Sequence, residues 1–160
     1  HLCEEATSIF KNGSFETWTN PAYPDFWKGK STNIDASGIV KETVNVHSGS
    51  ATLQLVNTST STHKRFTTQS IALDAGNYTC KYWASGSGQI RNAFVRNTDT
   101  TPIYSTYSSY TTLSSDTWQE ITYSFTSPAS STAFELIFSV LGTTATNNHV
   151  KIDDVICNKN

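Results

Sequence analysis

Aromatic and planar polar side chains are the residues of this chain whose types suit the binding of a cyclic, hydroxylated ligand. Phe, Trp and Tyr make up 12% of the sequence, whereas Asp, Glu, Lys and Arg together make up only 15%. An aromatic ring stacks on apolar C–H groups, and arginine, asparagine, glutamine or aspartate side chains bond to hydroxyl groups. The side chains that we expect to contact such a ligand are Trp83, Arg91, Tyr104, Tyr107, Lys81, His63 and Arg65.

The two-residue period of a strand selects these candidates. In residues 78–84 small and aromatic side chains alternate, which turns Tyr78, Cys80, Tyr82 and Ala84 inward and leaves Lys81 and Trp83 outside. Arg91 lies in the next expected strand, where we expect it to meet Trp83 across the strand pair. Residues 104, 107 and 110 are all tyrosines that cannot all be buried on one face, and His63 and Arg65 share one face of their strand.

Catalysis would need a convergent set of proton-transfer groups, such as two carboxylates. Glu120 and Glu135 fall on outward faces of expected strands that are neighbours in sequence, so they could approach each other, although ordinary solvation explains both. The four histidines are scattered, and no GxSxG motif is present. We therefore expect no enzyme.

The three cysteines lack the close spacing of zinc or redox motifs. The ends of compact domains are often neighbours, so we expect a disulfide between Cys3 and Cys157, and we expect Cys80 to be a buried thiol. Such a disulfide would place the protein in an oxidising, exported environment.

Nearly every segment has the character of a β-strand, because β-branched and aromatic residues alternate between frequent turn residues. The expected strands predict an all-β fold, an antiparallel two-sheet β-sandwich, in a single domain over residues 1–160. These strands cover residues 39–46, 51–57, 63–73, 78–84, 89–96, 103–111, 118–126, 133–141 and 149–157.

Charge and hydropathy exclude two classes of partner. The net charge of −2 provides no field for a polyanion, so we expect no nucleic acid. No apolar run approaches the roughly 18 residues that a spanning helix needs, so we expect no membrane insertion.

Several landmarks together carry a family resemblance. They are AsnGlySerPheGluThrTrp at 12–18, ProAspPheTrp at 24–27, ValHisSerGlySerAlaThrLeuGlnLeu at 46–55, AlaGlyAsnTyrThr at 75–79, ThrTrpGlnGlu at 117–120 and IleAspAspVal at 152–155. The landmarks span nearly the whole chain, and through them it resembles the jelly-roll carbohydrate-binding modules of families 4, 9, 16 and 22.

This resemblance implies a structural Ca²⁺ where the N-terminal strand meets the last strand. The matching positions are the Gly13 carbonyl, Glu16, Ser48 or Ser50, and Asp153 or Asp154. Calcium takes six to eight hard oxygens, which a mixture of carboxylates and carbonyls supplies. The family often has an acidic residue in the 47–50 turn, and this chain has none.

The resemblance also implies a function. We expect a non-catalytic module that holds a polysaccharide or oligosaccharide in a concave sheet groove and is tethered to a catalytic domain of a secreted or cell-surface protein of bacterial type. If the glycan is acidic, Lys64, Arg65, Lys81 and Arg91 would form the complementary patch. The alternative is a structural or protein-interaction sandwich that binds no sugar.

Overall fold

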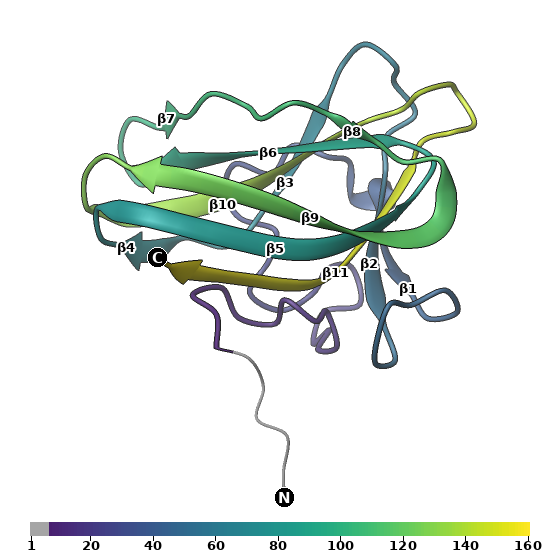
Figure 1. Ribbon diagram of the computed structural model, residues 1–160, viewed down its shortest axis with the longest axis horizontal. Helices are drawn as coiled ribbons and strands as arrows, with labels where there is room; N and C mark the ends of the chain where they lie inside the picture. Colours follow the sequence, from purple (N-terminus) through teal and green to yellow (C-terminus); the bar gives the residue numbers. More distant parts are fainter. Residues whose placement is uncertain (1–6) are drawn as a thin grey trace, which may run out of the picture.

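The chain folds into two antiparallel sheets packed face to face, as seen in a computed structural model that describes residues 7–160 (Figure 1). The five-stranded sheet has the order β1 (Ile39–Glu42), β2 (Thr52–Val56), β11 (His149–Lys159), β5 (Gly76–Gly86) and β9 (Ser115–Ser127). The six-stranded sheet contains β3 (Lys64–Thr67), β4 (Ile71–Leu73), β10 (Ser131–Leu141), β6 (Gln89–Arg96), β7 (Ile103–Tyr104) and β8 (Thr111–Thr112). One short 3-10 helix, η1 (Ala36–Gly38), precedes β1. The predicted all-β two-sheet sandwich is confirmed, and none of the described residues forms a helix long and apolar enough to cross a membrane.

Two predicted strands are each divided into two short ones. The predicted strand over residues 63–73 becomes β3 and β4, which both pair with β10. The predicted strand over residues 103–111 becomes β7 and β8, which both pair with β6. In each case the intervening residues leave the regular ladder, so the edges of the six-stranded sheet are irregular.

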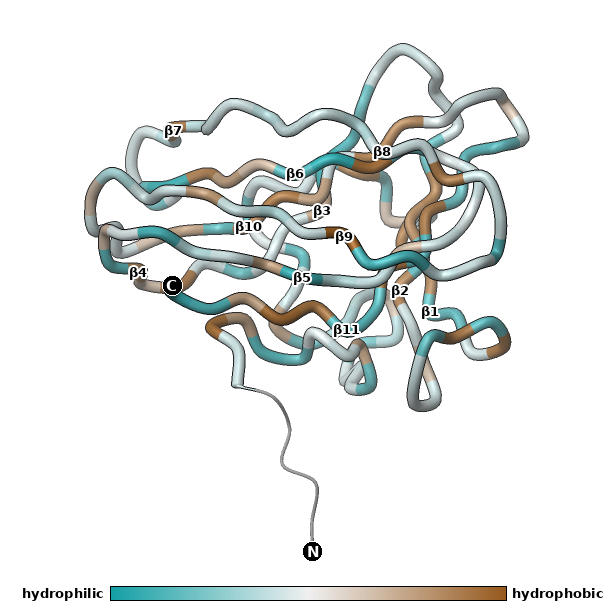
Figure 2. The backbone as a smooth tube through the Cα atoms, in the orientation of Figure 1, coloured by the Kyte–Doolittle hydropathy of each residue, from teal (hydrophilic) through white to brown (hydrophobic). Residues whose placement is uncertain are grey.

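The core lies between the sheets and is dominated by rings. Trp27 is fully buried, with its ring centroid 6.0 Å from that of Phe66 and 5.7 Å from that of Phe138. The inward set predicted for β5, Tyr78, Cys80, Tyr82 and Ala84, is buried as expected. In Figure 2 hydrophobic and hydrophilic segments both occur along β5, β6 and β11.

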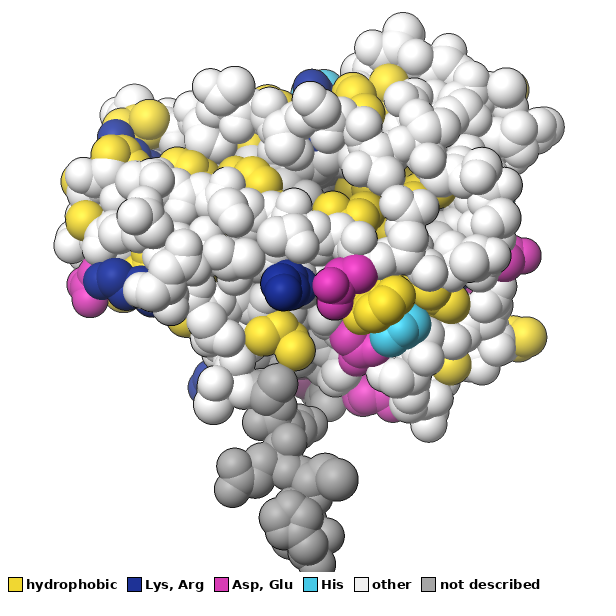
Figure 3. Space-filling view, in the orientation of Figure 1, with side chains coloured by type: hydrophobic (Ala, Val, Ile, Leu, Met, Phe, Trp, Pro, Cys, Tyr) yellow, Lys and Arg dark blue, Asp and Glu magenta, His cyan; other side chains and the backbone are white. Residues whose placement is uncertain are grey.

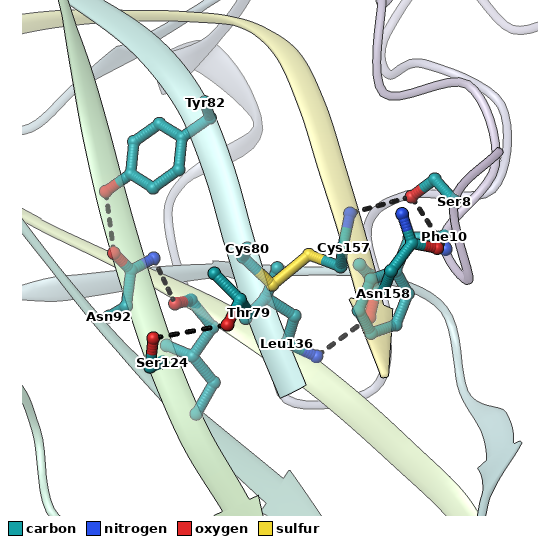
Figure 4. Close-up of a disulfide and its surroundings, with 12 residues drawn as sticks. Ser8, Phe10, Thr79, Cys80, Tyr82, Asn92, Ser124, Leu136, Cys157 and Asn158 are labelled. Atoms are coloured by element: carbon teal, nitrogen blue, oxygen red, sulfur yellow. Dashed lines mark hydrogen bonds between the residues drawn. A yellow bond between two sulfur atoms is a disulfide. The ribbon is translucent and has the colours of Figure 1, made fainter. Parts of the chain in front are cut away.

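A buried hydrogen bond joins the two sheets. The Tyr82 hydroxyl on β5 donates to Oδ1 of Asn92 on β6 at 2.6 Å, and the Asn92 amide donates to the Ile137 carbonyl of β10 (Figure 4). Burial raises the pKa of Tyr82 above its usual value. The hydroxyl therefore stays protonated and fixes β5 against β6 across the core.

The predicted disulfide between Cys3 and Cys157 is wrong, because the sulfur of Cys157 is bonded to that of Cys80 (Figure 4). Antiparallel pairing of β5 with β11 places these two cysteines directly opposite each other, and both are fully buried. Cys3 lies outside the described residues. The bond connects positions 77 residues apart and reinforces the ladder between β5 and β11.

Candidate functional site

Five of the seven predicted binding residues gather on the outer face of the six-stranded sheet. His63 and Arg65 come from the β3 region, Arg91 from β6, and Tyr104 and Tyr107 from the segment that follows β6. Tyr110 and Ser139, which the sequence did not single out as binding residues, complete the cluster. We call these seven residues the tyrosine–arginine face.

Arg91 lies at the centre of the tyrosine–arginine face. Its guanidinium carbon is 4.2 Å from the ring centroid of Tyr107 and 4.3 Å from that of Tyr110, so the planar group lies between two rings. Its Nε donates to Oγ of Ser139 at 3.2 Å, and the same Oγ lies 2.9 Å from Nδ1 of His63. Stacking and hydrogen bonding together hold this cation in one place.

Arg65 forms a second cation–ring pair beside the first. Its guanidinium carbon is 5.3 Å from the Tyr104 ring centroid, and its Nε donates to the Ser31 carbonyl at 2.9 Å. Burial raises the pKa of Tyr107, and the charges of Arg65 and Arg91 act in the opposite direction. Burial and the charges of Arg91, Arg65 and Lys64 lower the pKa of His63, so the imidazole is neutral at pH 7.

Two serines position the tyrosines against β6. Ser105 donates its N–H to the Phe94 carbonyl at 2.9 Å, and its Oγ accepts from the Phe94 N–H at 2.9 Å. Ser108 makes the same pair of bonds with Asn92, at 2.8 and 2.9 Å. We call these two residues the serine clamps. They fix the segment between β7 and β8 where the regular ladder is interrupted.

A small apolar cluster lies beneath Tyr107. Ala93 and Val95 of β6 and Ile137 of β10 are fully buried on the outer side of the sheet, and Tyr107 packs against them. The ring is therefore held from below, while Tyr104 beside it remains 44% exposed. The tyrosine–arginine face thus combines supported rings with fixed cations.

Trp83 and Lys81 lie on the outer face of the other sheet, separate from this cluster. Trp83 stacks on His47 with ring centroids 4.4 Å apart, and Trp118 meets His47 edge-on at 5.5 Å. We call His47, Lys81, Trp83, Trp118 and Glu120 the tryptophan face. Figure 3 shows hydrophobic, basic and acidic side chains together over this part of the molecule, where several of these residues line a hollow of about 350 Å³.

The predicted meeting of Trp83 and Arg91 is wrong, because β5 and β6 are not a hairpin. β5 pairs with β9 and β11, and β6 pairs with β10, so the chain crosses between the sheets at residues 86–88. The N–H groups of Ser87 and Gly88 both donate to the His149 carbonyl, and Gly86 has a φ of 128°. The turn residues predicted a bend correctly, but the bend leads to the opposite sheet.

The predicted calcium ligands lie around the junction of the N-terminal segment, the 47–50 turn and β11. Gly13, Glu16, Ser48 and Asp154 line one cavity of about 610 Å³. Glu16 accepts hydrogen bonds from the N–H groups of Ser50 and Ala51 at 2.8 and 3.0 Å. Gly49, at a φ of 67°, lies against this carboxylate, where a Cβ would come within 2.8 Å of its atoms.

One group of side chains at this junction offers ligand atoms for a metal. Ligand atoms of His47, Asp153 and Asp154 lie within 4.8 Å of one another. Burial raises the pKa of Asp153 to about 7, and the charge of Asp154 adds to the effect. Asp154 has a φ of 52° in an irregular part of β11. Two adjacent carboxylates, one of them buried, fit a divalent cation, because its charge would offset the cost of ionising both.

Comparison with known protein families assigns the chain. Residues 7–146 match the family model CBM_4_9, described as a carbohydrate binding domain. The chain belongs to this family of carbohydrate-binding modules. A search of curated protein sequences gave no match.

Solved structures of other modules share the fold. TmCBM61, solved in complex with β-1,4-galactotriose, is 17% identical with a TM-score of 0.64, covering 97% of this chain and 100% of that one. A family 16 carbohydrate binding module is 15% identical with a TM-score of 0.60, covering 95% of this chain and 100% of that one. The CBM22-1–GH10 modules of Clostridium thermocellum xylanase 10B, complexed with xylohexaose, are 14% identical with a TM-score of 0.57, covering 86% of this chain and 28% of that one.

The approach of Glu120 to Glu135 that the sequence allowed does not occur in this carbohydrate-binding module. β9 and β10 follow one another in sequence but belong to different sheets. Glu135 is fully buried and accepts hydrogen bonds from the Ser31 N–H at 3.1 Å, Thr67 Oγ1 at 2.7 Å and Ser70 Oγ at 3.0 Å. Its role is to hold the loop after Trp27 and the edge strands against β10.

Proposed function

We propose that this carbohydrate-binding module binds a polysaccharide or oligosaccharide chain on its tyrosine–arginine face without catalysing a reaction. The observation that carries this proposal is the Arg91 guanidinium held between the rings of Tyr107 and Tyr110. Supported rings offer surfaces for sugar C–H groups, and the fixed arginine offers a planar set of donors for ring hydroxyls.

The similar structures support a carbohydrate as the ligand class. One was solved with a galactotriose and another, in one chain with a GH10 module, with a xylohexaose. We propose that residues 1–160 act as one module tethered to a catalytic domain, which it concentrates at its substrate. The buried disulfide supports a secreted or cell-surface location, in a bacterial enzyme of this type.

The tryptophan face is the alternative platform. Trp83 and Lys81 remain candidate binding residues, but they lie on the outside of the five-stranded sheet. A single sugar chain lying across the six-stranded sheet therefore does not reach them. One face of the Trp83 ring is already stacked on His47, which leaves less ring surface for a sugar.

We also propose a structural Ca²⁺ held by Gly13, Glu16, Ser48 or Ser50, Asp153 and Asp154. The hard oxygens of these residues fit the ion, and the ion would supply positive charge that lets Asp153 and Asp154 ionise together. Nδ1 of His47 lies 2.6 Å from Oδ2 of Asp154, and an imidazole suits transition metals better than calcium.

Affinity electrophoresis through gels containing different polysaccharides tests the binding proposal. We expect one glycan to retard the wild type and Trp83→Ala equally. The same glycan should not retard Tyr107→Ala. Lys41→Gln, exposed on β1, is the matched surface control. Loss of retardation in Trp83→Ala but not in Tyr107→Ala would move the site to the tryptophan face. No retardation by any glycan would favour a structural or protein-interaction domain.

A further inference from the structure

We infer that the tyrosine–arginine face selects an acidic glycan, whose sugar carboxylates are bound by Arg65 and Arg91. This inference rests on the proposed function and names the substrate class of the same site.

The first step is that neither arginine has an acidic partner among residues 7–160. Residues 7–160 contain three ion pairs, and these are Lys30–Asp99, His47–Asp154 and Lys151–Asp116. None of the three involves Arg65 or Arg91. A partly buried cation with no carboxylate beside it would gain from an anionic ligand that replaces the water lost on burial.

The second step concerns how the arginines are held. The strand register places Arg65 on β3 and Arg91 on β6, on either side of β10, where both lie opposite Ser139. Each is anchored through Nε to a neutral oxygen, the Ser31 carbonyl for Arg65 and Ser139 Oγ for Arg91. These anchors fix the guanidinium planes and consume no negative charge. Both anchors use Nε, so a carboxylate would bind through the terminal amino groups of each fork.

The third step is the local sign of charge. Arg91, Arg65 and Lys64 all disfavour a proton on His63, so their positive fields overlap there. Glu135, an acidic side chain on the same sheet, is buried and engaged by Ser31, Thr67 and Ser70. The whole chain has a net charge of −2, so the attraction for an anion would come from this face and not from the molecule as a whole.

The fourth step is the balance of donors and acceptors. A neutral sugar needs acceptors as well as donors, because each of its hydroxyl groups carries a proton. Arginine is a donor only, and the ionised uronic acid carboxylate is an acceptor only. The planar fork of arginine matches the two oxygens of a carboxylate in a bidentate geometry, which a lysine cannot reproduce. The tyrosine hydroxyls and the neutral His63 can accept from sugar hydroxyls, whereas the two arginine forks match a uronic acid carboxylate better than they match a hydroxyl group.

Matched pairs of polysaccharides provide the test. Wild-type protein is run through gels containing polygalacturonate or alginate, and through gels containing the same polymers after chemical reduction of their carboxyl groups. Neutral β-1,4-galactan and xylan, and dextran sulfate with dextran, complete the panel. We expect retardation by a uronate polymer that disappears after carboxyl reduction and weakens when the salt is raised from about 0.05 to 0.5 M.

Variants locate the interaction. Arg91→Gln and Arg65→Gln should each weaken uronate binding by about tenfold or more, because a charge-assisted bidentate contact is lost. Arg91→Lys keeps the charge but not the fork, so we expect most of the loss to persist. Lys41→Gln should bind as the wild type does. Thermal unfolding of each variant shows whether it is folded, and Arg91→Lys carries the test if Arg91→Gln does not fold.

The outcomes separate the inference from the proposed function. Equal retardation by a neutral glycan and its acidic counterpart would overturn the inference and leave the binding proposal intact. Retardation by dextran sulfate alone would overturn the assignment to a carboxylate. If Lys41→Gln weakened uronate binding as much as Arg91→Gln does, the assignment of the site to the tyrosine–arginine face would be overturned. Retardation by no polymer at all would overturn the proposed function, and the inference with it.

Discussion

His63 lies among cations, and this setting makes its protonation unfavourable in the folded protein. Burial is the largest cause, followed by the charges of Arg91, Arg65 and Lys64, and its Nδ1 contacts Ser139 Oγ. Its pKa is therefore below 6.5, the value in an unfolded chain. Between the folded pKa and 6.5 the unfolded state binds more protons, so the free energy of unfolding falls as pH falls through that range.

We predict that His63→Gln reduces this loss of stability on acidification. The measurement is the difference in urea midpoint between about pH 7 and pH 5, compared for wild type and variant. His149→Gln is the control, because His149 is exposed on β11. An unchanged pH dependence in His63→Gln, or an equal change in the control, would contradict the prediction.

At the scale of elements, side-chain alternation predicts strands but not their partners. The inward residues of β5 and β10 follow from a period of two within a single segment. Pairing depends instead on which sheet each strand enters. Trp83 and Arg91 were expected to meet because their strands are consecutive, yet the chain changes sheet between them. Cys80 and Cys157 are bonded because β5 and β11 pair, and no local sequence pattern predicts that pairing.

The residues of the tyrosine–arginine face could be anticipated only in part, for the same reason. His63, Arg65, Arg91, Tyr104 and Tyr107 were each identified from local exposure or family position, and the six-stranded sheet brings them together. Tyr110 was seen as part of a crowded segment but could not be assigned to the site, since its contact with Arg91 depends on the interrupted ladder. The sequence places His47 only as the first residue of the 47–50 turn. Its stacking on Trp83 depends on the tertiary fold and could not be predicted.

The serine clamps hold the irregular edge that carries the proposed binding surface, so their removal tests that surface. Ser105→Ala and Ser108→Ala remove the acceptors for the N–H groups of Phe94 and Asn92. We expect each to lower the free energy of unfolding by about 1 kcal/mol. We expect a weaker affinity for glycan as well, because Tyr107 lies between the two clamps. Titration calorimetry with an oligosaccharide that the wild type binds measures the affinity, and urea unfolding measures the stability. Ser114→Ala is the control, because Ser114 is exposed. Unchanged affinity in both variants would contradict the positioning role.

The disulfide contributes to the five-stranded sheet itself. We predict that Cys80→Ala combined with Cys157→Ala lowers the free energy of unfolding by about 2–4 kcal/mol, because the bond restricts the unfolded chain between distant positions. Urea unfolding of the wild type before and after treatment with a reductant should give a loss of similar size. The double variant should show no further effect of reductant. A double variant as stable as the oxidised wild type would contradict this contribution.

For the whole molecule, the proposed glycan site and the candidate metal site lie on different sheets of the sandwich. The tyrosine–arginine face lies outside the six-stranded sheet, and the candidate metal cluster lies beside the five-stranded sheet. The cluster connects the segment around Gly13 and Glu16, the 47–50 turn, and β11. These segments are far apart in sequence and meet through contacts such as Ser48 N–H to Asp153 Oδ2 and Val155 N–H to the Gly13 carbonyl. A cation there would stabilise the arrangement of the chain without contacting the sugar.

We therefore predict that calcium changes stability and leaves glycan affinity nearly unchanged. At a free concentration about 100 times its Kd, a ligand specific for the folded state contributes about 2.7 kcal/mol. For a domain of this size that corresponds to a rise in Tm of roughly 5–10 °C over the chelator-treated protein. Asp153→Asn should abolish the rise, because it removes a buried carboxylate that would bind the ion, whereas Asp74→Asn, in the exposed turn before β5, should keep it.

Titration calorimetry with glycan, performed with calcium and with chelator well below both Tm values, should give Kd values within about twofold, since the two sites lie on opposite sheets. A chelator that weakened glycan binding tenfold while the protein stayed folded would show that the ion acts on the binding face, and the prediction would be wrong.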